Sequence, residues 1–227
     1  MRTSTPLSGD DELQKAAEAL EKWRGATGTV TVVAIDGHGA SGKSTIAAHL
    51  CAVSGASVVH TDDFFLPDLE APTGGGGRGL ESYYELARLR TEALGPLRAG
   101  QAARYHAFDW DSGRLSPART QVAPSSIVIV EGDCAAAPGL SDLVDRAIYV
   151  DTPEAERLRR LRERVVPEDW DSDWLRAEQD YFARVRPVES FDLVIRGSRT
   201  APTVLREARA PGEGRRAGNL STKSGEK

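Results

Sequence analysis

The chain has few of the residues that build disulfide frameworks, metal clusters or membrane spans. Its 227 residues include only two cysteines, Cys51 and Cys134, and we expect both to be buried, reduced thiols. No apolar run approaches the ~20 residues that cross a bilayer. Residues 1–6 lack the apolar region of a secretory signal. These absences predict a soluble, cytoplasmic protein with no membrane partner.

Lysine is also scarce. It occurs only at positions 15, 22, 43, 223 and 227, and the rest of the 29 basic residues are arginines. Lys43 is therefore the sole lysine of the expected folded core, which marks it for a specific role. The formal net charge of −5 gives no bulk attraction to polyanions, so we expect no nucleic-acid partner.

Apolar runs alternate with segments of helical spacing along most of the chain. Strands are expected at residues 29–35, 57–62, 126–132, 146–151 and 191–195, and helices at residues 10–23, 44–53, 83–98, 153–165 and 173–185. The segment 83–98 should break at Gly95-Pro96. This alternation predicts an α/β three-layer sandwich with a mostly parallel five-stranded sheet and helices on both faces.

Composition divides the chain into three parts. Residues 1–28 should form a tail and an edge helix, residues 29–196 the folded domain, and residues 197–227 a disordered tail without aromatic residues. Within the domain, the run Gly74 to Gly77 predicts a flexible loop. Because sites in parallel sheets lie at the carboxyl ends of strands, we expect the functional residues at that edge.

One segment fits the pattern G-x-x-x-x-G-K-[ST] without a mismatch, between an expected strand and an expected helix, as a P-loop requires. Its backbone N–H groups would point inward at phosphate, and a Cβ at Gly37 or Gly42 would obstruct that curl. The N-terminal end of the helix adds positive potential. The pattern predicts binding of a nucleoside triphosphate, taken as ATP, by Gly37, His38, Gly39, Ala40, Ser41, Gly42, Lys43, Ser44 and Thr45.

Three polar side chains in or near this loop suit phosphate and metal binding. Lys43 can bridge β- and γ-phosphate oxygens, and the Ser44 hydroxyl can ligate Mg²⁺. Glu131 ends an expected buried strand, where it can hold Mg²⁺ through water or satisfy backbone N–H groups of the next turn. The first role is the more common one in P-loop folds.

Two adjacent aspartates end the second expected strand. A kinase that acts on an alcohol needs a carboxylate to accept the hydroxyl proton. We predict Asp62 as this base and Asp63 as a supporting or metal-linked group. The alternative is a pair of capping or turn aspartates.

Residues 157–164 carry five arginines. On a helix, Arg157, Arg160 and Arg164 fall on one narrow stripe, which suits an arginine-rich lid over a γ-phosphate. The alternative is a solvated surface helix with salt bridges to neighbouring glutamates.

Aromatic residues could stack a planar base or could equally form core; they are Tyr83, Tyr84, Tyr105, Phe108 and Trp110. Glu85 and Asp109 could bind the hydroxyls of a sugar or cap helices. These positions alone do not decide between the alternatives.

Taken together, these segments resemble the uridine kinase family, which belongs to a group that includes pantothenate kinase and phosphoribulokinase. The resemblance covers about residues 29–196. It is carried by residues 37–45, Thr61-Asp62-Asp63-Phe64-Phe65, Phe108-Asp109-Trp110, Val130-Glu131-Gly132 and Tyr149-Val150-Asp151-Thr152-Pro153. The element after the second strand is the more diagnostic part, since a P-loop alone specifies only nucleotide binding.

The resemblance implies a P-loop NTPase fold and ATP- and Mg²⁺-dependent transfer of the γ-phosphoryl group to a primary hydroxyl, usually the 5′-OH of uridine or cytidine. Asp62 matches the catalytic aspartate of the family. Arg160 and Arg164 fall in the lid. A small-molecule acceptor is then the expected partner, and a homo-oligomer is left open.

On the acceptor side, the resemblance aligns Phe65 with a position that is often tyrosine. It aligns Glu85 with an aspartate near the ribose hydroxyls, and residues 108–110 with an element that flanks the base. A family histidine after that element has no match here, where Ser112-Gly113-Arg114 stand. The lid Arg-Asp reads Arg162-Glu163 or Arg164-Val165. The alternatives are therefore another small alcohol, such as a pantothenate-like metabolite or a nucleoside antibiotic, or a regulatory NTPase.

Overall fold

The computed structural model describes residues 9–66, 79–163 and 171–197. The expected loop glycines 74–77, Arg164 of the expected lid and almost all of the expected C-terminal tail lie outside these residues.

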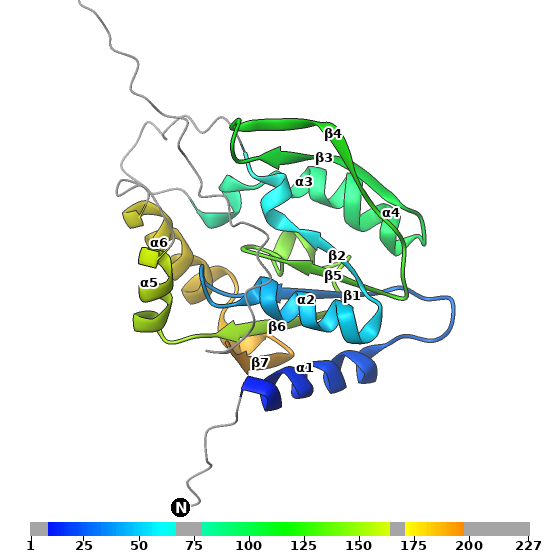
Figure 1. Ribbon diagram of the computed structural model, residues 1–227, viewed down its shortest axis with the longest axis horizontal. Helices are drawn as coiled ribbons and strands as arrows, with labels where there is room; N and C mark the ends of the chain where they lie inside the picture. Colours follow the sequence, from blue (N-terminus) through cyan, green and yellow to red (C-terminus); the bar gives the residue numbers. More distant parts are fainter. Residues whose placement is uncertain (1–8, 67–78, 164–170, 198–227) are drawn as a thin grey trace, which may run out of the picture.

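The centre of the molecule is a five-stranded sheet with the strand order β2-β5-β1-β6-β7, in which all neighbours are parallel. The strands are β1 (Thr31–Asp36), β2 (Ser57–His60), β5 (Ile127–Glu131), β6 (Arg146–Asp151) and β7 (Leu193–Arg196). The predicted parallel sheet is confirmed (Figure 1). The P-loop, Asp62 and Glu131 lie at the carboxyl ends of its strands.

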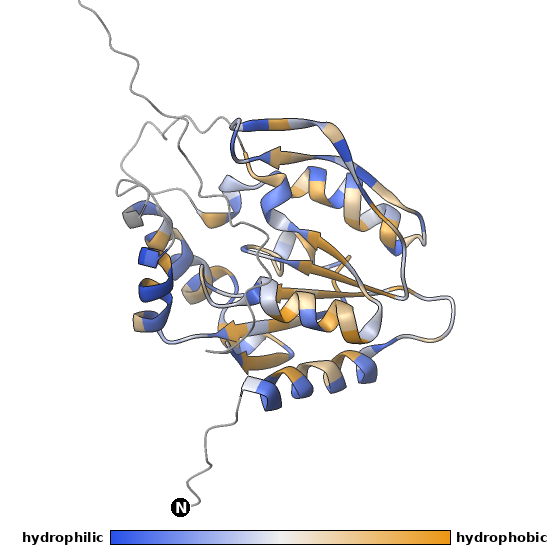
Figure 2. Ribbon diagram, viewed as in Figure 1, coloured by the Kyte–Doolittle hydropathy of each residue, from blue (hydrophilic) through white to orange (hydrophobic). Residues whose placement is uncertain are grey.

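The sheet has a separate apolar core on each face, because successive strand residues point to opposite sides. Val32 and Ala34 of β1 belong to one buried cluster, whereas Val33 and Ile35 belong to the other. The face of Val33 is covered by α1 (Gly9–Trp23) and α2 (Lys43–Ser54), and the face of Val32 by α3 (Leu86–Arg88) and α4 (Gly95–Arg98). Hydrophobic residues follow the strands and the inner sides of these helices (Figure 2). The three-layer α/β sandwich is confirmed.

Helix α1 belongs to the core of the folded unit. Ala16 and Leu20 are fully buried in the same cluster as Ile46 and Leu50 of α2. Its Glu12 side chain accepts a hydrogen bond from the backbone N–H of Arg196 in β7. The expected edge helix therefore completes one layer of the sandwich, and the packed unit begins before residue 29.

The helical segment after residue 85 differs from its prediction. We expected a break at Gly95-Pro96, but a π-helix, η3 (Leu89–Leu94), joins α3 to α4 without interruption. Gly95 has helical φ and ψ angles of −59° and −54°, and Pro96 stands in the first turn of α4. The wider π turn accommodates the proline ring, which would clash with an ordinary α-helical turn.

Two strands that the periodicity did not reveal form an antiparallel hairpin, β3 (Ala103–Asp109) and β4 (Arg114–Val122). β3 buries Tyr105 and Phe108, but most of β4 is exposed or half-exposed. Because β4 contributes little to a buried face, its sequence lacks the apolar alternation by which strands are recognised.

At the carboxyl edge, β6 leads into α5 (Glu154–Glu163), and α6 (Asp171–Asp180) continues as the π-helix η6 (Tyr181–Val185). The short 3-10 helices are η1 (Thr61–Phe64), η2 (Leu80–Tyr83), η4 (Pro138–Leu140) and η7 (Val188–Ser190). Among the residues described, none of the helices has the length and apolar character to span a membrane. Both thiols are free, with Cys134 buried and Cys51 half-buried.

Candidate active site

The P-loop, residues 37–45, joins the end of β1 to the first turn of α2. Gly37 has a φ of +146°, and a Cβ there would lie 2.8 Å from the carbonyl oxygen of Val150. Gly42, with a φ of +101°, is the N-cap of α2, and no described side chain caps this end. The first N–H groups of α2 are therefore available to an anion such as a phosphate group.

Lys43 is buried beside this loop and donates three hydrogen bonds. Its Nζ lies 2.7 Å from Gly37 O, 3.1 Å from His38 O and 2.7 Å from Asp133 Oδ1. Burial by itself would lower the pKa of Lys43, but the attraction of Asp133 outweighs it and raises this pKa above its usual value. Lys43 is therefore positively charged and held by its own loop.

Asp133 is a site residue that the sequence prediction missed. It follows Glu131 by two positions, just beyond the carboxyl end of β5, and it is buried. The available signal was this second acidic residue after a buried strand, at the edge where the P-loop was expected.

Ser44 and Glu131 bring two possible metal ligands together. Ser44 Oγ donates a hydrogen bond to Glu131 Oε2 at 3.2 Å, and Glu131 Oε1 contacts His60 Nδ1 at 2.5 Å. A hydroxyl and a carboxylate beside a phosphate loop fit Mg²⁺, which takes its remaining ligands from phosphates and water. Both described partners of the Glu131 carboxylate are side chains, which favours the metal role over the capping of backbone N–H groups.

Asp62 lies on η1, directly after β2, and keeps access to solvent. The surrounding protein atoms, followed by repulsion from Asp133 and Glu131, raise the pKa of Asp62 to about 7, against the influence of Lys43 and His60. Solvent access moderates this shift without reversing its direction. Because η1 follows β2 directly, Asp62 lies at the same edge of the sheet as Lys43, where a carboxylate can accept a hydroxyl proton.

The neighbouring residue, Asp63, makes structural contacts with the surrounding elements. Asp63 Oδ2 accepts a hydrogen bond from the Tyr105 hydroxyl at 2.8 Å, and its backbone carbonyl accepts one from Arg88 at 3.3 Å. These contacts join η1 to the hairpin and to α3. They favour the supporting role of Asp63 over the metal-linked one, and they place Tyr105 in the core.

The arginines of α5 divide between the P-loop and the surface. Arg160 Nη1 donates to Ala40 O in the P-loop at 3.1 Å, while its Nε donates to Glu156. Arg157 is the buried residue of α5, and its Nη1 lies 3.9 Å from Glu178 Oε2. The predicted lid helix therefore contacts the P-loop through Arg160.

The outer side of α5 is a solvated surface with salt bridges, as the alternative interpretation of this helix expects. Arg159 pairs with Glu156 and Glu163 at the surface. Leu158 and Leu161 of the same helix are only half-buried. One helix thus combines a salt-bridged outer face with arginines that face the P-loop side.

Aromatic rings gather next to η1. The Phe65 ring centroid lies 4.6 Å from that of Trp110, 5.3 Å from Phe108 and 6.4 Å from Trp174. The Trp174 ring lies 4.9 Å from Tyr83. Tyr83 and Trp110 are half-buried, so their rings are accessible from solvent. We call this group the aromatic wall; it consists of Phe65, Tyr83, Tyr84, Phe108, Trp110 and Trp174.

Glu85 and Asp109 have protein partners. Asp109 Oδ1 accepts a hydrogen bond from the backbone N–H of Asp111, and Oδ2 accepts one from the Ser112 hydroxyl, each at 3.1 Å. Glu85 Oε2 accepts a hydrogen bond from Arg88 Nε at 2.7 Å. These local contacts fit a structural role for Glu85 and Asp109, such as capping, and sugar binding by either residue stays a prediction.

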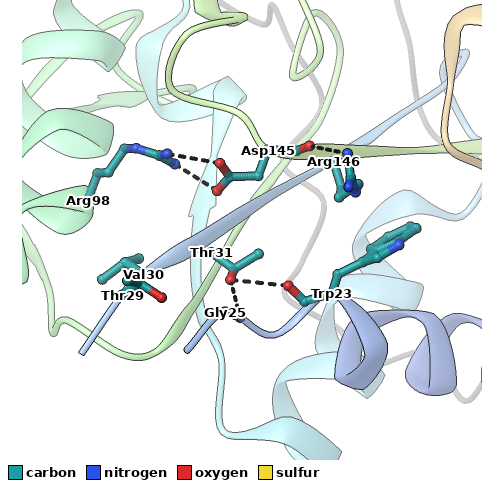
Figure 3. A pocket seen from close by; sticks show the side chains of 8 residues that line it. All are labelled: Trp23, Gly25, Thr29, Val30, Thr31, Arg98, Asp145 and Arg146. Atoms are coloured by element: carbon teal, nitrogen blue, oxygen red, sulfur yellow. Dashed lines mark hydrogen bonds and ion pairs between the residues drawn. The ribbon is translucent and has the colours of Figure 1, made fainter. Parts of the chain in front are cut away.

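A hollow of about 330 Å³ lies at the opposite edge of the sheet (Figure 3). It adjoins the starts of β1 and β6, where Arg98 makes two hydrogen bonds to Asp145 at 2.7 and 2.8 Å. The Asp145 carbonyl also accepts a hydrogen bond from Arg146. Because parallel sheets carry their sites at the other ends of the strands, this hollow is not the candidate active site.

The sheet order and the P-loop define an α/β P-loop fold, which two solved structures share. A possible uridine kinase from Bacillus stearothermophilus shares it with a TM-score of 0.63 and 19% identity, over 82% of this chain and 98% of that one. A candidate fructose transport system kinase from Silicibacter sp. TM1040 has a TM-score of 0.55 and 23% identity, over 80% and 98%. No protein-family model matches the chain.

Proposed function

We propose that this chain is an ATP-dependent small-molecule kinase that transfers the γ-phosphoryl group to a hydroxyl. The proposal rests on one observation. A P-loop with its buried Lys43, the Ser44–Glu131 pair and the Asp62 carboxylate all lie at the carboxyl edge of one parallel sheet. Phosphoryl transfer needs these three elements together, because it depends on positioning and charge stabilisation.

In this proposal the P-loop N–H groups and Lys43 hold the β- and γ-phosphates, and Arg160 adds a second positive charge from α5. Mg²⁺, when bound by Ser44 and Glu131, would neutralise charge on the phosphate oxygens. Asp62 accepts the proton of the acceptor hydroxyl. The hydroxyl oxygen then forms a bond to the γ-phosphorus as the bond from that phosphorus to the ADP oxygen breaks.

The proposed acceptor is the 5′-OH of a pyrimidine nucleoside. The aromatic wall supports this choice, because half-buried rings such as Trp110 can stack on a planar base. The sequence resemblance and the neighbour described as a possible uridine kinase point the same way. The lack of the family histidine after residue 110, and the sugar named for the second neighbour, favour the alternative of another small alcohol.

The test is a panel of alcohols with ATP and Mg²⁺, in which ADP formation and the phosphorylated product are both measured. We expect uridine or cytidine to stimulate ADP formation well above the rate without acceptor. Turnover of pantothenate or a hexose alone would keep the kinase and replace its acceptor. Slow ATP hydrolysis that no alcohol stimulates would favour a regulatory NTPase instead.

A further inference from the structure

Helix α6 and its continuation η6 contact the end of β1 and the first half of the P-loop. Figure 1 shows α6 at the carboxyl edge of the sheet, on the side of α5. The contacts join Glu178 to Gly39, Tyr181 to Asp36 and Phe182 to His38. In the proposed function this helix supplies Trp174 to the aromatic wall, and Glu178, Tyr181 and Phe182 have no assigned role.

The contact of Glu178 with Gly39 is the most unusual of them. Glu178 Oε1 accepts the backbone N–H of Gly39 at 2.7 Å, and the residue is 1% exposed. A Cβ at position 39 would lie 3.1 Å from the same oxygen, so a larger residue there would crowd this close approach. A carboxylate oxygen therefore occupies a P-loop N–H group, of the kind that P-loops use to bind phosphate oxygens.

This arrangement opposes nucleotide binding by charge. The N–H of Gly39 cannot serve a phosphate oxygen fully while it serves Glu178. Burial, followed by repulsion from Asp133, raises the pKa of Glu178 to about 7. A negative charge on this side chain is thus already disfavoured before a triphosphate adds more.

Glu178 is also connected to the aromatic wall. The same Oε1 accepts a hydrogen bond from Trp174 Nε1 at 3.1 Å. The Trp174 ring in turn lies 4.9 Å from that of Tyr83 and 6.4 Å from that of Phe65. A continuous set of contacts therefore runs from the proposed acceptor side to the P-loop.

We propose that Glu178 is a positioning residue that competes with the nucleotide for the Gly39 N–H, and that Trp174 links this contact to the aromatic wall. The inference rests on the proposed function, since it connects its donor and acceptor sides. Without nucleotide, Glu178 holds the loop. When nucleotide binds, a phosphate oxygen takes over the N–H, and the released Glu178 loosens its hold on Trp174. By reciprocity, a molecule that shifts Trp174 would favour nucleotide binding.

The test measures binding of a non-hydrolysable ATP analogue with Mg²⁺ and no acceptor, by calorimetry on the full chain. Glu178→Gln keeps an oxygen that can accept the Gly39 N–H, but it removes the charge that strengthens this hydrogen bond and repels a triphosphate. We therefore expect the analogue to bind roughly 5-fold tighter or more, a usual size for coupled sites. Glu189→Gln on η7 is the matched control, since it removes the same charge from an exposed side chain. Its affinity should equal that of the wild type.

Trp174→Phe is the second variant, because it keeps an aromatic ring and removes the N–H that holds Glu178. We expect its affinity to lie between those of the wild type and Glu178→Gln, and wild-type affinity would overturn the link to the aromatic wall. Equal or weaker binding by a folded Glu178→Gln would overturn the competition. If the wild type and all variants fail to bind the analogue, the proposed function fails together with this inference.

Discussion

Lys43 Nζ lies 2.7 Å from Asp133 Oδ1, and both side chains are almost fully buried. The pair joins the P-loop to the turn that follows β5, the strand next to β1. Removing one partner of a buried ion pair is costly because the other charge stays away from water. Asp133 therefore fixes the P-loop lysine in the nucleotide-free protein.

The first prediction concerns this ion pair. Asp133→Asn removes the charge but keeps one oxygen that can accept from Lys43, whose two backbone carbonyl partners remain. We therefore expect a loss of about 1–3 kcal/mol in the free energy of unfolding, below the full cost of an unpaired buried charge. Urea denaturation of the nucleotide-free protein measures it.

Asp142→Asn is the control for that experiment. Asp142 pairs with Arg90, but its side chain is 60% exposed. Exposed pairs of this kind contribute little, so the change should stay within about 1 kcal/mol. Equal losses for the two variants would mean that the Lys43–Asp133 pair has no special role in stability.

The second prediction concerns the proposed base. Asp62→Asn cannot accept the hydroxyl proton, so we expect turnover to fall by ~10²-fold or more, with little change in ATP affinity. Steady-state kinetics with the acceptor identified in the panel, together with ATP-analogue binding, measure both quantities. Near-normal turnover would remove Asp62 from the base role.

Asp63→Asn separates this effect from general damage to η1. Asp63 accepts a hydrogen bond from the Tyr105 hydroxyl, so its replacement should lower stability, by about 1 kcal/mol. Turnover of the folded fraction should stay near that of the wild type. A 100-fold loss in both variants would point to a distorted η1 instead of a lost base.

The parts of the fold that the sequence predicted correctly are those with a strong local pattern. The continuous apolar strands and the glycine pattern of the P-loop depend on residues close together in the chain, so the sheet and the phosphate loop were predictable. The hairpin was not, because β4 is largely exposed. The continuation of the helix through Pro96 was not predictable either, because a π turn accommodates a proline that would interrupt an ordinary α-helix.

The residues of the candidate site divide in the same way, into those of local sequence motifs and those that depend on long-range contacts. Lys43, Ser44 and Asp62 belong to motifs, and the structure brings them to one edge of the sheet. Asp133 and Glu178 gain their roles from partners 90 and 139 positions away. Such contacts depend on strand order and on the path of α6, which a local pattern does not contain.

The third prediction concerns the aromatic wall. Trp110 is half-buried on the hairpin, with its ring 4.6 Å from that of Phe65. If the acceptor has a planar ring that stacks here, Trp110→Ala should raise the acceptor KM roughly 10-fold, as expected for the loss of about 1.4 kcal/mol of stacking. The KM for ATP should not change.

Trp23→Ala is the matched control for Trp110→Ala. Trp23 is also half-buried, but it lies beside the hollow at the opposite edge of the sheet. Its replacement should leave both KM values unchanged, although stability can fall. An unchanged acceptor KM in Trp110→Ala would exclude this ring from the acceptor site.

The fourth prediction concerns the pH dependence of stability through Asp36, which ends β1. Asp36 is fully buried and accepts hydrogen bonds from the N–H groups of Gly37 and Ala136 and from the Tyr181 hydroxyl. Burial raises its pKa to about 7, against the hydrogen bond from Ala136 and the attraction of Lys43.

In the unfolded chain Asp36 titrates near its ordinary pKa of about 3.9. The folded protein therefore binds the proton more tightly, and the stability that this group contributes is lost as the pH rises through about 7. Asp36→Asn cannot titrate, so between about pH 5 and pH 8 its stability should rise relative to the wild type by about 2–3 kcal/mol. Urea denaturation of both proteins across this range measures the change, whatever constant offset the altered hydrogen bonds cause. A difference that does not vary with pH would mean that the folded protein holds Asp36 ionised throughout, with its negative charge stabilised by Lys43 and the two N–H groups.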